Sequence, residues 1–383
     1  MSHKTLSHKT ILLHLSDLLW SCVIITPLAV LGWRGMWDLL DQVISISKFS
    51  SFLMFFSLSF FQVFPNDPES YNGNLEEVFT AEISPWSALA SYVTGLLCKI
   101  MLDLCREKTG EYLSESKKIV KYTIGWSIRI IQGVAMVAYW RGTFGLLSNN
   151  IGEGVLPVCL VLVTSSLLLA TVKVSKCGIF PPLVLITDSH DQTFQNGLYF
   201  RSSPGEQGFL LLDCIFSNFV IKIVPILAWW SLWCLENKYF SHNVIGEKDE
   251  VISYDSLISG YALVMITFMA DKLLPYEQFH KVVSRFSKLF ITFLSIVATL
   301  NVWRGVWSWF DHCFFPFIPG TSNYVLGLLV SIVGLTITLS TNTLGGDSIN
   351  FDDEDMAVID IQYWSLVDDT LDNEETEPIC GAK

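Results

Sequence analysis

The chain has 383 residues, of which 51% are hydrophobic, 13% aromatic and 16% charged. A composition this apolar excludes an ordinary soluble enzyme, and several apolar runs reach the length of a membrane span. The net charge of −13 is concentrated in one stretch, because twelve acids and one base lie between Gly345 and Lys383. The acidic balance therefore does not indicate a nucleic-acid partner.

The first apolar run covers residues 11–32 and follows Lys4 and Lys9. It is too long for the core of a signal peptide, so we expect a retained signal-anchor helix. The run ends in a Trp-Arg-Gly tripeptide, which occurs three times in the chain and once more in degenerate form. The copies are Trp33-Arg34-Gly35, Trp140-Arg141-Gly142, Trp229-Trp230-Ser231 and Trp303-Arg304-Gly305.

The similarity between the copies extends beyond the tripeptide. Four residues after the first Trp comes an aromatic residue, and eight residues after it comes a small polar or acidic residue of the kind that caps helices. The aromatic residues are Trp37, Phe144, Trp233 and Trp307, and the polar residues are Asp41, Ser148, Asn237 and Asp311. Repetition at this level predicts one structural unit that is used four times.

Eight spans follow from the apolar runs, and the odd-numbered ones end in the motif. They cover roughly 11–32, 86–104, 119–140, 153–173, 208–230, 255–274, 285–303 and 322–341. With both termini inside, the inner segments hold 15 of the 24 Lys and Arg residues, which is the positive-inside pattern. The predicted fold is an all-α polytopic bundle of eight transmembrane helices, arranged as four parallel two-helix repeats with cytosolic termini.

Three regions flank or interrupt this plan. Residues 1–10 are expected to be a cytosolic N-terminus, residues 11–344 the membrane domain, and residues 345–383 an acidic, disordered cytosolic tail. Residues 43–62 are apolar enough for a ninth span, but inserting them would invert the charge pattern after them. They are either a retained intron in the gene sequence or a hydrophobic outer-loop insertion on the bilayer surface.

The motif has a structural interpretation and a functional one. At the outer end of a helix, Trp suits the membrane interface, Arg suits the negative end of the helix dipole, and Gly can end the helix in a left-handed conformation. The motif would then be an interfacial anchor and turn. In the alternative, the arginines form an outer ring that receives an anionic ligand or partner.

Four ionisable side chains lie inside predicted spans, where a charge is costly: Asp17, Arg129, Asp213 and Lys222. One interpretation is a polar interior that binds a solute or a proton. The other is a pair of interhelical ion pairs, each joining Lys or Arg to Asp, that hold the bundle together.

The sequence indicates no catalytic site, metal site or cofactor. It contains no Gly-rich phosphate loop, no His-Glu-x-x-His and no Gly-x-Ser-x-Gly. The nine cysteines lack metal-ligand spacing. Cys234 and Cys313 both fall on the predicted outer face, where a disulfide could join them. We expect a protein without enzymatic activity.

The motif-bearing segments LGWRGMWDLLD and NVWRGVWSWFDHCFFP, together with the inner segment Pro181-Pro182-Leu183-Val184-Leu185-Ile186-Thr187-Asp188, resemble the fuseless family of multi-pass membrane proteins. The resemblance covers about residues 10–345 and implies a presynaptic plasma-membrane protein. Such a protein would organise voltage-gated calcium channels and support transmitter release. Its partners would be the lipid bilayer and proteins that bind the acidic tail. The alternative is a secondary transporter of a small solute, because transporters are often built from internal repeats.

Overall fold

The computed structural model describes residues 8–46, 84–189, 193–194, 197–202, 207–240, 248–273, 281–313, 318, 320–345, 349, 351–352, 358–359 and 361. Over these residues the chain is helical and contains no strand. The anomalous stretch 43–62 lies outside the described residues, except for its first four residues, which continue a helix.

Each predicted span overlaps a helix or a run of consecutive helices, although the spans 153–173 and 322–341 extend beyond the ends of theirs. The first is continuous through α1 (His8–Trp20), the π-helix η1 (Ser21–Ile25) and α2 (Thr26–Ile46). The next three are α5 (Pro85–Ser114), α6 (Lys118–Asn150) and α7 (Val155–Thr171). The fifth combines α9 (Gln207–Phe216), the π-helix η4 (Ser217–Ile221) and α10 (Ile223–Phe240). The last three are α11 (Lys248–Leu273), α12 (Lys281–Cys313) and α13 (Thr321–Ile337), and short 3-10 helices follow α7 and α13: η3 (Ser175–Gly178) and η6 (Thr341–Leu344).

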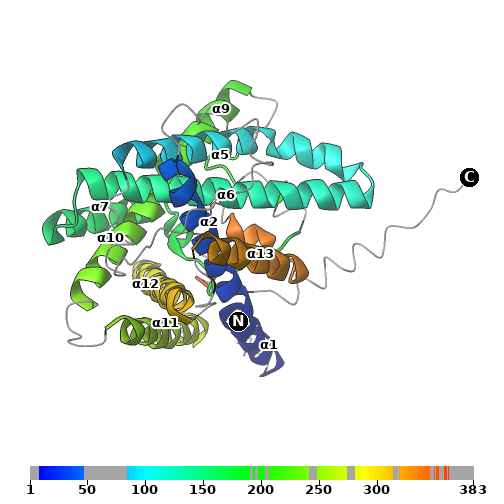
Figure 1. The fold of residues 1–383 in the computed structure, drawn as a ribbon. Coiled ribbons are helices and arrows are strands. Elements are labelled where there is room, and N and C mark those ends of the chain that lie inside the picture. The colour runs from blue at the N-terminus through cyan, green and yellow to red at the C-terminus, as the bar shows by residue number, and fades with distance from the viewer. Residues whose placement is uncertain are drawn as a thin grey trace, which may run out of the picture.

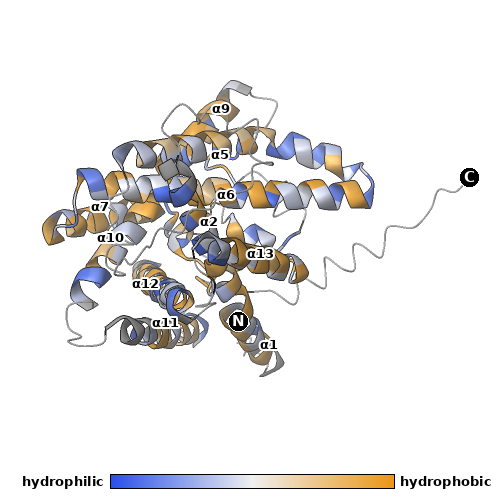
Figure 2. Cartoon of the chain, in the orientation of Figure 1, coloured by the Kyte–Doolittle hydropathy of each residue, from blue (hydrophilic) through white to orange (hydrophobic). Residues whose placement is uncertain are grey.

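Four of these helices are both long and apolar enough to cross a membrane. The qualifying stretches are Leu12–Gln42, Pro85–Ser114, Gly208–Tyr239 and Val283–His312. The apolar helices α7 and α13 are shorter, at 17 residues each. Large apolar side chains such as Ile337 and Leu156 are exposed on the helices. Figure 2 shows that apolar residues, in orange, recur along most of the helices. These features are compatible with a membrane protein.

Each of the four motif-bearing helices has one main partner. Figure 1 shows α5 beside α6 and α11 beside α12, and the closest packing also pairs α7 with α10 and α2 with α13. In three pairs the partner is the helix that precedes the motif helix in the chain. The first motif helix, α2, has no such predecessor, and it pairs with the last helix, α13. The bundle therefore closes on itself.

The helix pairs approach closely through glycine. A Cβ added to Gly305 would lie 2.6 Å from the backbone nitrogen of Leu257 in α11, and one added to Gly35 would lie 2.8 Å from the carbonyl oxygen of Tyr324 in α13. Gly142 in α6 meets the backbone nitrogen of Tyr92 in α5 even more closely. Small residues that let two backbones touch are typical of helix packing in membranes.

The predicted inner loop 105–121 is in fact mostly helical. α5 ends at Ser114 and α6 begins at Lys118, so that only three residues connect them. The far ends of α5 and α6 form a helical hairpin that carries hydrophilic side chains, drawn in blue in Figure 2. Charged residues led to the prediction of a loop here, but Lys, Arg and Glu are also favourable helix formers. The two helices can therefore continue through this charged region.

Candidate functional site

The motif does not end any of the four helices. Trp33 lies seven residues into α2, which continues to Ile46, and α6, α10 and α12 likewise continue beyond their copies. The positive-φ glycines among the described residues are Gly152 and Gly320, neither of which belongs to the motif. The predicted helix-ending turn is therefore wrong. The motif glycines serve the close packing of helix pairs instead.

The first Trp of each copy is buried and not interfacial. The exposed fractions of Trp33, Trp140, Trp229 and Trp303 are 3, 5, 3 and 4%. Their ring centroids are 5.4 Å apart from Trp33 to Trp140, 5.6 Å from Trp140 to Trp229, 5.9 Å from Trp229 to Trp303 and 5.3 Å from Trp303 to Trp33. All four contacts are edge-to-face, the arrangement that the ring quadrupole favours. The four indoles thus form a closed ring, which we call the tryptophan ring.

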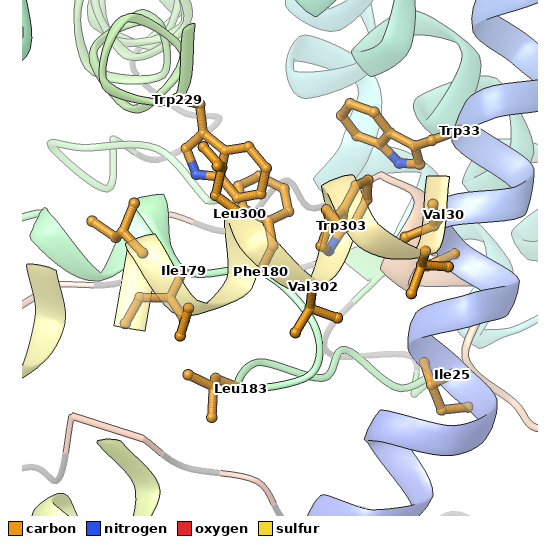
Figure 3. Close-up of a cluster of buried hydrophobic side chains, with 14 of the residues drawn as sticks. Ile25, Val30, Trp33, Ile179, Phe180, Leu183, Trp229, Leu300, Val302 and Trp303 are labelled. Carbon is orange, nitrogen blue, oxygen red and sulfur yellow. The ribbon is translucent and has the colours of Figure 1, made fainter. Parts of the chain in front are cut away.

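Phe180 covers one side of the tryptophan ring and contacts all four indoles. Its centroid lies 6.3 Å from that of Trp33, 5.3 Å from Trp140, 5.1 Å from Trp229 and 5.9 Å from Trp303. It belongs to the segment between η3 and Pro182, and Figure 3 shows it reaching from this segment toward Trp229 and Trp303. An aromatic side chain from a loop therefore fills the axis that the four motif helices surround.

Three of the buried indole N–H groups donate to backbone carbonyls. Trp229 donates to Gly178 at 2.8 Å, Trp303 to Pro181 at 2.8 Å and Trp33 to Leu344 at 3.1 Å. A buried N–H requires an acceptor, and the two segments that follow α7 and α13 provide it. The indoles therefore fix these two segments against the bundle as well as packing with one another.

A second aromatic layer lies one helical turn further along. Trp37 makes edge contacts with Phe144 and Trp307, at centroid distances of 5.9 and 6.2 Å. Trp233, at the corresponding place in the degenerate copy, is partly buried and packs against the same core. The residues four positions after the motif Trp therefore repeat the inward orientation of the Trp itself, as helical periodicity requires.

The motif arginines connect neighbouring motif helices. Arg34 of α2 pairs with Asp311 of α12 at 2.5 Å, and Arg141 of α6 pairs with Asp41 of α2. Arg304 of α12 pairs at 3.5 Å with the carboxylate of Glu236 in α10. The arginines retain exposed fractions of 4, 2 and 8%.

The degenerate copy completes this set of connections. Trp230 occupies the position of the arginine, and its indole nitrogen donates to the hydroxyl of Ser148 in α6 at 3.1 Å. A neutral donor thus meets a neutral acceptor where the other copies pair charges. The same contact therefore occurs four times around the bundle. In each copy, the residue that follows the motif Trp forms an ion pair or a hydrogen bond with a polar residue of a neighbouring copy. That polar residue lies seven or eight positions after its own motif Trp. We call these four contacts the polar ring.

The arginines are engaged by acids and hydroxyls of the bundle. Arg141 also donates to the hydroxyls of Ser91 and Ser87 in α5, at 2.6 and 3.0 Å. Arg34 lies 3.9 Å from Asp38, and its guanidinium stacks 5.1 Å from the centre of the Tyr324 ring. Burial and pairing of this kind disfavour the interpretation in which the arginines receive an outer anion.

Two of the four ionisable side chains expected inside the spans form ion pairs with acids outside that set. Lys222 pairs with Asp103 of α5 at 3.2 Å, and Arg129 pairs with Asp188 at 3.6 Å. Asp213 accepts from the backbone N–H groups of two residues in the segment before α9, at 3.1 Å each. Asp17 is buried, with 1% exposed. Ion pairs between separate segments are therefore present, and the carboxylates that these two pairs use, Asp103 and Asp188, are outside the four residues that the sequence singled out.

Several important residues had little sequence signal. Asp103 lies in α5, outside the four motif copies, Glu236 lies in α10 one position before the repeated polar position at Asn237, and Phe180 lies in a loop. Asp188 ends the Pro-Pro-Leu-Val-Leu-Ile-Thr-Asp segment, which the sequence comparison singled out for another reason. Within the described helices and loops, no group of three or more His, Cys, Asp or Glu residues could hold a metal ion. Cys234 is a free thiol, so that it forms no disulfide with Cys313.

Comparison with known proteins gives one match. No curated protein and no solved structure matches the chain. The model of a family described as Fuseless matches residues 70–344, a region that contains three of the four motif copies and the Phe180 segment. Because this match covers well over half of the sequence, the chain belongs to the Fuseless family.

Proposed function

We propose that this protein is a non-enzymatic membrane organiser that crosses the presynaptic plasma membrane eight times, with both termini in the cytosol. It would assemble voltage-gated calcium channels and so support transmitter release, through contacts made by its acidic C-terminal stretch. Membership of the Fuseless family supports this role, and the positive charge of the α5–α6 hairpin supports a cytosolic position for that end of the bundle.

We further infer that the eight crossings are four parallel repeats. The closed tryptophan ring and the four contacts of the polar ring support this inference, because each motif copy offers the same two positions to its neighbours. Independent helices with a chance likeness would have no reason to contact one another at equivalent positions. Trp230 of the degenerate copy, which replaces an arginine, meets Ser148 of the Trp140 copy, which stands where two other copies have aspartate, and this match points the same way.

The observation that carries the organiser proposal is the filled axis of the bundle. A secondary transporter holds its solute near the middle of the membrane, at the interface between repeats. Here that interface is occupied by five aromatic rings, with centroid distances from Phe180 of 5.1 to 6.3 Å. Packing of this density favours a rigid scaffold over a solute pathway along the axis.

A clustering assay in neurons tests the organiser proposal. We expect a variant that lacks residues 362–383 to reach the plasma membrane and to lose calcium-channel clustering. Phe180→Ala at matched surface expression is the control for damage to the bundle, and it should retain clustering. Normal clustering in the truncated variant would reject a role for these residues, and normal clustering without the protein would reject the organiser function.

The transporter alternative rests on one specific feature. Lys222 and Asp103 form a buried ion pair directly after the π-helix η4, where the regular hydrogen-bond ladder of the helix is interrupted. π-helical turns are frequent at functional sites. Saturable uptake into proteoliposomes that is lost in Lys222→Ala would favour transport. Absence of flux across a panel of small solutes, with intact folding of the reconstituted protein, would favour the organiser.

A further inference from the structure

The two segments that follow α7 and α13 have the same local design. Each helix ends with a residue in the left-handed conformation, Lys173 at a φ of 56° and Leu339 at a φ of 51°. The next residue donates its N–H back to the helix, from Val174 to the carbonyl of Leu169 and from Ser340 to that of Leu335. A 3-10 helix then follows, η3 in one case and η6 in the other. This is a helix C-terminus of the Schellman type, used at two equivalent places.

Each 3-10 helix is capped by an aspartate from the segment that follows the other one. Asp188, which comes after η3, accepts from the N–H of Asn342 at 2.8 Å and from the hydroxyl of Thr341 at 2.5 Å in η6. Asp352, which comes after η6, accepts from the N–H groups of Ser175 and Lys176 in η3 at 2.9 and 3.1 Å. The caps are therefore exchanged between the two halves of the chain.

The backbone contacts of the two aspartates also correspond. The N–H of Asp188 donates to the carbonyl of Leu339 at 2.8 Å, and the N–H of Asp352 donates to that of Lys173, also at 2.8 Å. In both cases the acceptor is the left-handed residue that ends the preceding helix of the other half. Each aspartate thus uses its backbone N–H and both carboxylate oxygens in the same way, and each donates to a residue in the left-handed conformation. This correspondence indicates a two-fold relationship between the halves.

The stretch around Asp352 belongs to the region for which composition predicts disorder. That prediction is wrong for the residues of this region that the structure describes. Ile349, Val358, Ile359 and Ile361 have exposed fractions of 8, 4, 0 and 2%. Val358 and Ile359 donate their N–H groups to the carboxylate of Asp271 in α11 at 3.0 and 3.1 Å. The side chain of Lys272 donates to the carbonyl of Ile359 at 2.7 Å.

The two caps differ in strength. Asp188 also faces Arg129, which pairs with its carboxylate at 3.6 Å and donates to its carbonyl at 3.0 Å. Among the described residues no cation pairs with the carboxylate of Asp352. Arg201 contacts the same stretch by stacking 5.0 Å from the ring centre of Phe351. Release of Asp188 from η6 would also disturb its contacts with Arg129, whereas release of Asp352 from η3 breaks only hydrogen bonds.

We propose that the described residues from Ile349 to Ile361 form a latch on the inner end of the bundle. The latch is equivalent to the segment from Ile179 to Asp188. Of these two segments, the latch is the one that detaches from the bundle, while the segment from Ile179 to Asp188 stays in place. In the closed state it caps η3 through Asp352 and covers α11 through Val358 and Ile359. When it opens, the N–H groups of η3 and the carboxylate of Asp271 become available to water or to another protein.

Hydrogen exchange of the full-length protein in lipid nanodiscs tests this proposal without any substitution. We expect protected amides at Val358 and Ile359, and at least tenfold faster exchange at Ser175 and Lys176 than at Asn342. Exchange of Val358 and Ile359 at the rate of an unstructured peptide would overturn the latch. Equal protection at the two caps would overturn its preferential opening.

Two matched variants extend the test. In Asp352→Asn we expect a further tenfold or greater increase at Ser175 and Lys176, with Asn342 unchanged. Asp188→Asn is the reciprocal control, and it should accelerate exchange at Asn342. If the amides of Ser175 and Lys176 exchange as slowly in Asp352→Asn as in the wild type, the carboxylate of Asp352 does not hold η3 to the other half of the chain. Removal of residues 362–383 should leave all of these amides unchanged.

Discussion

Replacement of Phe180 by alanine tests the central packing most directly. The side chain is buried, with 8% exposed, and its ring makes edge contacts with all four members of the tryptophan ring. Truncation would leave a cavity that four indoles, each fixed by its own helix, can only partly fill. Buried Phe→Ala substitutions cost about 3–5 kcal/mol.

A membrane environment changes the origin of this cost but not its sign. Within lipid, helix association is driven by packing and hydrogen bonding rather than by removal of apolar surface from water. The lost aromatic pairs, each worth roughly 0.5–1.5 kcal/mol, then account for most of the effect. We therefore expect a loss near the lower end of the range, about 3 kcal/mol. At about 2 °C per kcal/mol for a chain of this size, the Tm should fall by roughly 6 °C.

The assay is thermal unfolding in detergent, followed by the loss of the monodisperse peak in fluorescence-detected gel filtration. Phe286→Ala is the matched control, because Phe286 lies on α12 and is 68% exposed. This control should change the Tm by less than about 2 °C, as exposed substitutions usually cost little. If the two variants melt together, the tryptophan ring is not held by Phe180 and the filled-axis argument is refuted.

Three further predictions concern the polar ring, the helix contacts and the buried charges. Trp230→Arg alone should lower stability by about 1–3 kcal/mol, because it buries a cation against a hydroxyl, and adding Ser148→Asp should recover at least half of the loss in a double-mutant cycle. Gly142→Ala should separate α5 from α6 and abolish the folded gel-filtration peak, whereas Gly208→Ala, with open space around it, should leave that peak intact. Asp103→Asn should cost about 3–5 kcal/mol by the same thermal assay, since it leaves buried cations without their carboxylate; a change below about 1 kcal/mol would show that other groups neutralise them.

The sequence by itself determined the helices and the residues that recur. Long apolar runs are helical in a low-dielectric environment because only a helix satisfies its own backbone polar groups, and each predicted span does overlap a helix. The motif positions were also visible, because Trp, Arg and Gly recur at fixed spacing. The first and third motif-bearing segments also share an aromatic-Ser pair, Trp20-Ser21 and Phe216-Ser217, and at each pair the α-helix changes to π-helix.

Only the tertiary structure decided what the motif residues contact. The sequence places Trp33 and Trp303 at equivalent points of two helices, but whether they face lipid, water or each other depends on how the helices rotate when the bundle closes. That closure also brings Arg34 to Asp311 across 277 positions of the chain, a separation over which local spacing carries no information. The same holds for Phe180, whose central position depends on a loop. The burial of Ile359 has a similar cause, because acidic composition describes the solvation of the unfolded stretch, whereas the contact of Ile359 with Asp271 of α11 forms only on folding.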